Sequence, residues 1–192
     1  MKRYTYPSDA SKQVILMTLP IHQTIRITPA SAVSDFDAAR RLFSAYARLL
    51  GIDLSFQNFT VEVDTMPGQY ATPHGELLLA CDSNPGPIGC VAMRPILPEG
   101  CCKMKRLYVA QTGRGRGIGA ALVEAIINTA TRIGYHEMRV DTLPVMDAAL
   151  ALYRKAGFHT IRPYYETSLE GTIFLGRTLC PSWPSTKAFC SR

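Results

Sequence analysis

The sequence has few of the features that mark fibrous, disordered or membrane-spanning chains. Its 14 glycines and 13 prolines are near average usage, and 47% of the 192 residues are hydrophobic, which excludes collagen-like and disordered classes. No apolar run approaches the roughly 20 residues that a membrane helix needs. The longest runs, Leu77 to Cys81 and Gly89 to Met93, are only long enough for strands. We therefore expect a globular protein without a membrane partner.

Motifs for metal binding and secretion are also absent. The six cysteines form no C-x-x-C pair and have no zinc-site spacing with the four histidines, so we expect no metal. The N-terminal apolar stretch Val14 to Leu19 is short and ends at Pro20, unlike a signal peptide. This favours a cytoplasmic protein with reduced thiols. Cys81 and Cys90 would be either a pair of small core side chains or, under oxidation, a cross-strand disulfide.

Positive charge exceeds negative charge and is clustered. The 21 Lys and Arg against 15 Asp and Glu give a net charge of +6, which favours anionic partners. Five of these cations fall beside one glycine-rich turn: Lys103, Lys105, Arg106, Arg114 and Arg116. The cluster lacks the interleaved aromatic side chains of an RNA-binding sheet, so no nucleic-acid partner is expected.

The residue pattern predicts one domain over residues 24–179, preceded by an irregular arm (1–23) and followed by a tail (180–192). Residues 83–87 are strong turn formers and predict an antiparallel hairpin. Apolar and β-branched runs predict seven strands: Thr24–Thr28, Glu76–Cys81, Ile88–Arg94, Cys102–Val109, Met138–Leu143, Phe158–Arg162 and Thr172–Leu179.

Helical periodicity and end signals predict the helices. Ser34 followed by Asp37 resembles a capping box, and Gly51 is placed to end that helix. A short helix is expected within residues 52–75. An apolar helical face runs from Gly117 to Gly134, and another helix spans residues 146–156 before Gly157.

The glycine-rich turn at residues 111–120 lies between a predicted strand and a predicted helix. Glycines let backbone N–H groups approach a ligand, and the helix N-terminus adds partial positive charge, so phosphate is the natural occupant. No Gly-Lys-Ser or Gly-Lys-Thr follows, which excludes a P-loop. Gly115, Gly117 and Ala120 match a dinucleotide-binding G-x-G-x-x-A, with Asp141 as the ribose-binding acid. However, the preceding strand is too charged for the buried first strand of that fold.

Three segments together resemble the GNAT superfamily of N-acetyltransferases over residues ~24–179. Arg114 to Gly119 fits the R/Q-x-x-G-x-G/A signature, and Lys105 to Val109 resembles the central strand. Ala149 to Phe158 resembles the A-x-x-L-Y-x-x-x-G-F segment. The resemblance implies an α/β (α+β) fold with a mixed, mostly antiparallel sheet of six to seven strands. About four helices would flank this sheet, and its central strand pair would splay apart.

The resemblance also implies acetyl-CoA as the acyl donor and assigns roles to residues of this chain. The pantetheine arm would pair with the backbone of Leu107, Tyr108 and Val109. Tyr153 would donate a proton to the departing thiolate. The pyrophosphate would lie on the N–H groups of one segment: Arg114, Gly115, Arg116, Gly117, Ile118, Gly119 and Ala120.

One position departs from the family pattern. Members similar to this stretch often read Cys-Glu-Met-Lys, with the glutamate suited to deprotonate the amine, whereas this chain has Lys103. A cation there would repel an incoming ammonium group. Either another group such as Glu62, Glu76 or His74 acts as the base through water, or the acceptor is less basic, or the activity is weak. The acceptor pocket would involve residues 52–75 and 164–166, whose acidic and aromatic side chains suit a cationic or amphipathic amine.

These observations favour transfer of an acetyl group to a primary amine of a small molecule or peptide, by direct attack in a ternary complex. Because of Lys103, a non-catalytic acyl-CoA-binding or sensing domain is the alternative. An NAD(P)-binding oxidoreductase is a weaker one. A homodimer is left open beside a monomer.

Overall fold

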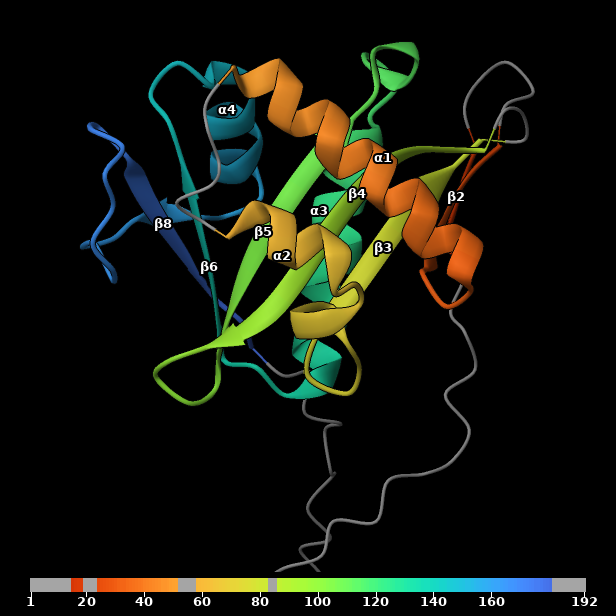
Figure 1. Ribbon diagram of the computed structural model, residues 1–192. Helices are drawn as coiled ribbons and strands as arrows, with labels where there is room; N and C mark the ends of the chain where they lie inside the picture. The colour runs from red at the N-terminus through yellow and green to blue at the C-terminus, as the bar shows by residue number, and fades with distance from the viewer. Residues whose placement is uncertain (1–14, 19–23, 52–57, 83–85, 181–192) are drawn as a thin grey trace, which may run out of the picture.

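The computed structural model describes residues 15–18, 24–51, 58–82 and 86–180. Its strands form one eight-stranded sheet in the order β1-β2-β3-β4-β5-β6-β8-β7 (Figure 1). All neighbouring strands are antiparallel except β5 and β6. The strands are β1 (Ile15–Thr18), β2 (Thr24–Pro29), β3 (Glu76–Cys81), β4 (Pro87–Ile96), β5 (Cys101–Val109), β6 (Glu137–Thr142), β7 (His159–Thr160) and β8 (Ile173–Thr178).

Helices cover both faces of the sheet. In Figure 1, α1 (Val33–Leu50) and α2 (Phe59–Asp64) cross in front of the sheet, while α3 (Ile118–Ile133) lies behind it and α4 (Asp147–Lys155) stands beside β6. Alternate side chains of each strand therefore enter different cores. Met93, Met104 and Leu122 belong to the core under α3. Phe43 and Leu79 belong to the core under α1. The predicted fold class is confirmed.

Glycine residues in the left-handed conformation end two of the helices. Gly51 and Gly134 both adopt the left-handed conformation, at φ 61° and 103°, and end α1 and α3 as predicted. The start of α1 differs from the prediction. Ala32 is the N-cap, and the Asp35 carboxylate accepts hydrogen bonds from the backbone N–H groups of Ser31 and Ala32. Asp37, the predicted capping partner, pairs with Arg40 instead.

The strands agree with the predicted runs except at the edges of the sheet, where one strand is added and one is shorter than predicted. β1 lies inside the predicted irregular arm and pairs with β2, so the sheet begins before residue 24. The predicted Phe158–Arg162 strand is only the two-residue β7. Residues 181–192 of the predicted tail lie outside the described residues. In the described part of the chain, no helix has the length and apolar character to cross a membrane.

The β3–β4 hairpin is confirmed, but its cysteines do not face each other. Cys90 lies opposite Leu79, and Cys81 lies opposite Pro87. Both thiols are free, and Cys90 is fully buried in the core under α1. Of the two interpretations of this pair, the structure supports core packing.

The central strands separate after three residue pairs, which confirms the predicted splay. β5 and β6 pair in parallel only from Cys101 opposite Glu137 to Lys103 opposite Arg139. β5 continues along β4 as far as Val109, while β6 turns to β8 (Figure 1). The backbone edge of β5 beyond Lys103 therefore has no strand partner on the β6 side among the described residues.

A β-bulge in β5 accompanies this separation. Lys105 lies opposite Ala92 and Tyr108 opposite Cys90, so two residues of β5 face Val91 alone. Arg106, one of the two, has φ 57°, a left-handed conformation that is strained for a residue other than glycine. The bulge interrupts the alternation of the strand. As a result, the consecutive side chains of Lys105 and Arg106 both contact Glu62 of α2.

The Glu62 carboxylate clamps the bulge to α2. Arg106 donates from Nε and Nη2 to the two carboxylate oxygens, both at 2.7 Å, and the Tyr70 hydroxyl donates to Oε1 at 2.6 Å. Burial alone would raise the pKa of Glu62. The hydrogen bonds from Arg106 and the charge of Lys105 outweigh burial and lower the pKa to about 2. A carboxylate with three such partners is a poor proton acceptor and a strong structural link.

Glu62→Gln should destabilise the fold, because it leaves the buried Arg106 without a counter-charge. Removing one partner of a buried pair costs about 3–5 kcal/mol. Since the folded pKa of Glu62 is lowered, its stabilisation is present above the unfolded value of 4.5 and disappears as pH falls toward about 2. Urea unfolding at pH 7 and pH 3 should show a wild-type advantage that shrinks at the lower pH.

The exposed Glu124 on α3 supplies the control. Glu124→Gln should leave unfolding unchanged at both pH values. A Glu62→Gln variant as stable as wild type at pH 7 would contradict the clamp.

Candidate active site

The N-terminus of α3 offers unpaired backbone donors. Gly117, at φ 74°, is the N-cap; α3 has no side-chain cap and no acid in its first turn. The first intrahelical hydrogen bond reaches Gly117 from Ala121, so the N–H groups before Ala121 have no partner within the helix. Gly119 also brings α3 close to α4, because a β-carbon there would lie 3.4 Å from Leu152. The predicted pyrophosphate segment thus carries the donors that a phosphate requires.

The two loop arginines differ in their surroundings. Arg114 is exposed, and its Nε donates weakly to the Val109 carbonyl at 3.4 Å. Arg116 donates from Nη1 to Asp82 at the end of β3, at 2.8 Å. Arg116 Nη2 is buried without a hydrogen-bond partner in the described residues. Arg116 therefore fixes the glycine turn to the β3–β4 hairpin and keeps a donor for an anion.

The pantetheine residues lie where the prediction puts them, on the open edge of β5. Leu107 and Val109 pack their side chains on the core under α3. Tyr108 points to the other face, with its ring 6.1 Å from that of Tyr46 on α1. These side chains are fixed on both faces of the sheet, while their backbone faces the gap between β5 and β6.

Tyr153 of α4 closes this gap from the α3 side. The tyrosine is 6% exposed and its ring packs 5.9 Å from that of Phe158. It lines a narrow pocket between β5 and β6 together with Met104, Leu107 and Asp141. Burial, with smaller contributions from Tyr46 and Asp141, raises the pKa of Tyr153, so the phenol stays protonated at neutral pH.

A polar cluster occupies the position where the strands separate. Lys103 of β5 forms a buried ion pair with Asp141 of β6, and its Nζ lies 4.2 Å from the centre of the Tyr165 ring. The Tyr164 hydroxyl donates to the same carboxylate at 3.2 Å. Burial lowers the pKa of Lys103, although Asp141 opposes this effect. The predicted repulsive cation therefore has a counter-charge next to it, supplied by the neighbouring strand.

The predicted base residues are not brought together. Glu62 is held in the clamp. Glu76 lies on the side of β3 that faces α3, where its carboxylate accepts a hydrogen bond from the Leu77 N–H at 3.1 Å. Burial raises the pKa of Glu76. His74 lines a large cavity of about 1350 Å³ next to Lys103, along with Tyr164, Tyr165 and Glu166 of the predicted acceptor segment.

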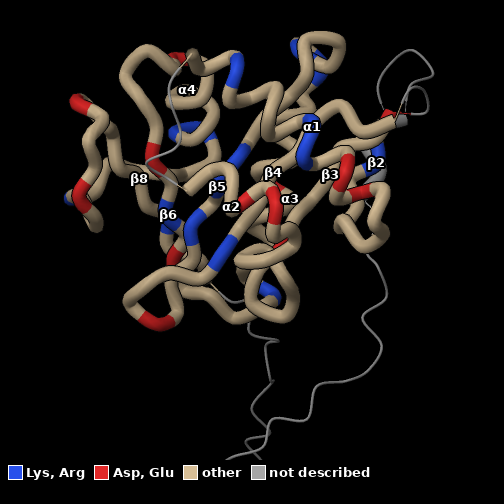
Figure 2. The backbone as a smooth tube through the Cα atoms, viewed as in Figure 1, with Lys and Arg blue, Asp and Glu red and all other residues tan. Residues whose placement is uncertain are grey.

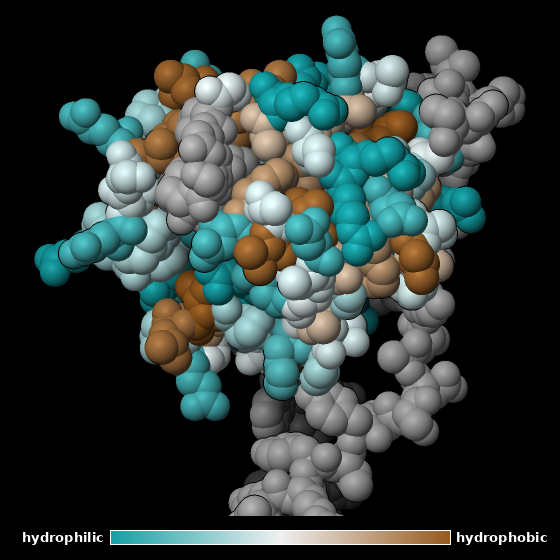
Figure 3. All heavy atoms as spheres, viewed as in Figure 1, coloured by the Kyte–Doolittle hydropathy of each residue, from teal (hydrophilic) through white to brown (hydrophobic). Residues whose placement is uncertain are grey.

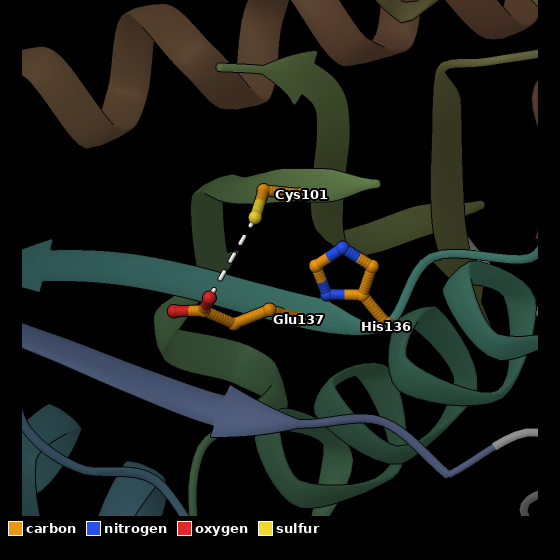
Figure 4. Close-up of side chains that lie close together, drawn as sticks. All are labelled: Cys101, His136 and Glu137. Carbon is orange, nitrogen blue, oxygen red and sulfur yellow. Dashed lines mark hydrogen bonds between the residues drawn. The ribbon is translucent and has the colours of Figure 1, made fainter. Parts of the chain in front are cut away.

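Three potential metal ligands also lie close together. The ligand atoms of Cys101, His136 and Glu137 lie within 4.8 Å of one another (Figure 4). Arg139, however, donates to both carboxylate oxygens of Glu137, at 2.8 and 3.1 Å. The Cys101 thiol donates to the same carboxylate at 3.6 Å. A cation would have to displace the guanidinium, so we assign no metal to this group.

Sequence reasoning missed Arg94 and the role of Asp141. Arg94 lies opposite Lys103 in the β4–β5 register and lines the same cavity. Its position as the only charged residue of the otherwise apolar run Ile88–Arg94 was the available signal. Asp141 had been considered only as a ribose-binding acid, because its pairing with Lys103 depends on the sheet order.

The fold and the site define an α/β protein whose central strands β5 and β6 splay apart next to an uncapped helix N-terminus. Residues 39–158 match the acetyltransferase (GNAT) family, and the chain belongs to this family. An uncharacterised N-acetyltransferase of Schizosaccharomyces pombe is 37% identical over 151 residues, which cover 79% of this chain and 93% of the relative. An IAA acetyltransferase of Azospirillum brasilense is 32% identical over 130 residues, covering 67% of this chain and 81% of the relative.

A solved structure agrees with this assignment at the level of the fold. A GNAT-family acetyltransferase from Staphylococcus aureus has a TM-score of 0.68 and 19% identity, covering 81% of this chain and 99% of that chain. The chain is thus an acyltransferase of the class that takes its acyl group from an acyl-CoA. This membership replaces the dinucleotide-binding interpretation of Gly115, Gly117 and Ala120.

Breaking the link between Arg116 and Asp82 should weaken coenzyme A binding. Arg116→Gln and Asp82→Asn should each raise the dissociation constant about tenfold, because a charged hydrogen bond contributes about 1.5 kcal/mol. The double variant should be less than additive in titration calorimetry with coenzyme A.

Arg114→Gln is the matched control, since that side chain is exposed. It should change the affinity by less than threefold, about 0.6 kcal/mol. Wild-type affinity for coenzyme A in Asp82→Asn would show that binding by Arg116 does not require its ion pair with Asp82.

Proposed function

We propose that this chain transfers the acetyl group of acetyl-CoA to an amine by direct attack. The observation that carries the proposal is the pocket between β5 and β6 that the buried Tyr153 lines, together with the uncapped N-terminus of α3 that follows the end of β5 along the chain. A diphosphate at the helix and a peptide-like arm along the open β5 edge would bring a thioester beside this phenol. Release of free thiol from acetyl-CoA across a panel of amines tests the activity.

Tyr153 is suited to supply the proton that the leaving thiolate needs. Its raised pKa keeps the hydroxyl protonated over the whole assay range, and its packing against Phe158 restricts the ring. When the amine attacks, the C–S bond breaks and the thiolate takes this proton. The neighbouring charge of Asp141 disfavours ionisation of the phenol, so the group regains a proton readily after transfer.

The charged residues that line the acceptor cavity favour the neutral, deprotonated form of a bound amine. Neither Glu62 nor Glu76 presents a free carboxylate to this cavity. Arg94 lines it beside the paired Lys103 and Lys105, and its uncompensated positive charge would lower the pKa of a bound amine. We propose that the neutral amine binds from solution and passes its proton to water after attack, without a dedicated carboxylate base.

Tyr153→Phe should lower kcat about 100-fold or more, the usual contribution of a general acid, with little change in coenzyme A affinity. Steady-state kinetics and calorimetry measure the two effects separately. Thr129→Val is the control: it removes a buried hydroxyl of α3 that lines neither pocket, and it should keep wild-type turnover. Wild-type turnover in Tyr153→Phe would exclude the assigned role.

The pH dependence should follow the acceptor. For two acceptors of similar shape whose amine pKa values differ by about 2, the rising limb of kcat/KM should move by about the same amount. Rates measured from pH 6 to 10 give the limb for each. If the rising limb of kcat/KM lies at the same pH for both acceptors, a residue of the protein acts as the base, and the proposal is wrong.

A further inference from the structure

The floor of the large cavity carries three cations from two adjacent strands. Arg94 of β4 lies opposite Lys103 of β5, and Lys105 follows two residues later on the same face. All three line the cavity of about 1350 Å³. In Figure 2 the blue segments of β4 and β5 lie close together in the sheet.

Carboxylates compensate only part of this charge. Asp141 pairs with Lys103, and Glu62 pairs with both Lys105 and Arg106. Among the described residues, these two carboxylates thus pair with three cations of this group. Arg94 has no ion pair in this part of the chain, and its Nε is buried with no hydrogen-bond partner there. The surplus positive charge is located at Arg94.

The surplus positive charge affects the pKa values of the neighbouring lysines. Burial and the charge of Arg106 lower the pKa of Lys105 to about 8, and Arg94 contributes to the lowering for both Lys105 and Lys103. The acids at the rim, Glu99 and Glu166, are exposed and form no ion pair with Arg94. Arg94 is half-buried, and burying its Nε donor without a partner has a cost.

A carboxylate fits this position. The two terminal nitrogens of the half-buried Arg94 guanidinium form a planar fork that matches two carboxylate oxygens. The cavity also has aromatic walls, Tyr164 and Tyr165, next to the cationic floor. Resting on the acetyl transfer proposed above, we infer that the acceptor is an amine that also carries a carboxylate, which Arg94 binds.

Matched acceptor pairs test this inference. In each pair, one molecule is an amino-carboxylate and the other carries a primary amide in place of the carboxylate. The exchanged group lies at least three carbons from the amine, so the amine pKa barely changes between the two molecules. A peptide with a free C-terminus and its C-terminal amide form another pair. Wild type should prefer the carboxylate at least tenfold in kcat/KM. Arg94→Gln should reduce this preference to less than threefold, and Arg94→Lys should retain part of it.

Two controls separate specificity from folding. Arg41→Gln removes an exposed arginine of α1 and should keep the wild-type preference. Arg94→Gln should melt no lower than wild type, because it removes an uncompensated charge. An equal loss of activity toward carboxylate and amide, together with a lower melting temperature, would assign Arg94 a structural role and overturn the inference.

A binding measurement distinguishes failure of this inference from failure of the proposed function. Calorimetry with the coenzyme A-saturated protein should show the amino-carboxylate binding at least tenfold more tightly than its amide, and Arg94→Gln should abolish the difference. This result supports the inference even if no amine is acetylated, in which case the proposed function alone is wrong. Equal binding of the two members in every pair overturns the inference, whatever the turnover.

Discussion

The contact between Glu62 and Arg106 is the interaction on which the site depends. Arg106 occupies a left-handed conformation that costs about 1–3 kcal/mol, and two hydrogen bonds of 2.7 Å to a buried carboxylate hold it there. The bulge that results turns Lys105 and Arg106 to the same side, and β5 and β6 are no longer paired at this point. The clamp thus holds the bulge next to the backbone edge of β5 that has no partner strand on the β6 side in the described residues.

The two ends of β5 carry different groups. At one end the strand leads through the glycine turn to the uncapped α3, where Arg116 and Asp82 hold the turn. At the other end, Lys103 and Asp141 meet where pairing with β6 ceases. Hydrophobic side chains on the α1 and α2 face are scattered between hydrophilic ones (Figure 3), so on the part of this face that the structure describes, charge rather than apolar area distinguishes the site.

Local signals in the sequence predicted the elements well, and tertiary contacts account for most of the differences. Gly51 and Gly134 end helices because their left-handed conformation is a property of the residue itself. The glycine turn was found for the same reason. By contrast, Glu62 was predicted as a base because nothing near it in sequence reveals Arg106 and Tyr70 as its partners. The capping box was misplaced by two residues, since Ser34 and Asp37 satisfy the pattern as well as the observed pair does.

The charge at Lys103 then has a physical explanation that the family pattern alone did not suggest. A lysine in the place of an acid would be costly if it were isolated, but β6 supplies Asp141 and the loop before β8 supplies Tyr164 and Tyr165 around it. The pair cancels locally, so the field in the cavity is set by Arg94, whose partner is absent from the described chain. A substrate ammonium would enter this field at a cost, whereas a neutral amine attached to an anion would not. Lys103 is therefore accommodated by Asp141, and under our proposal the preference for a carboxylate-bearing acceptor comes from Arg94.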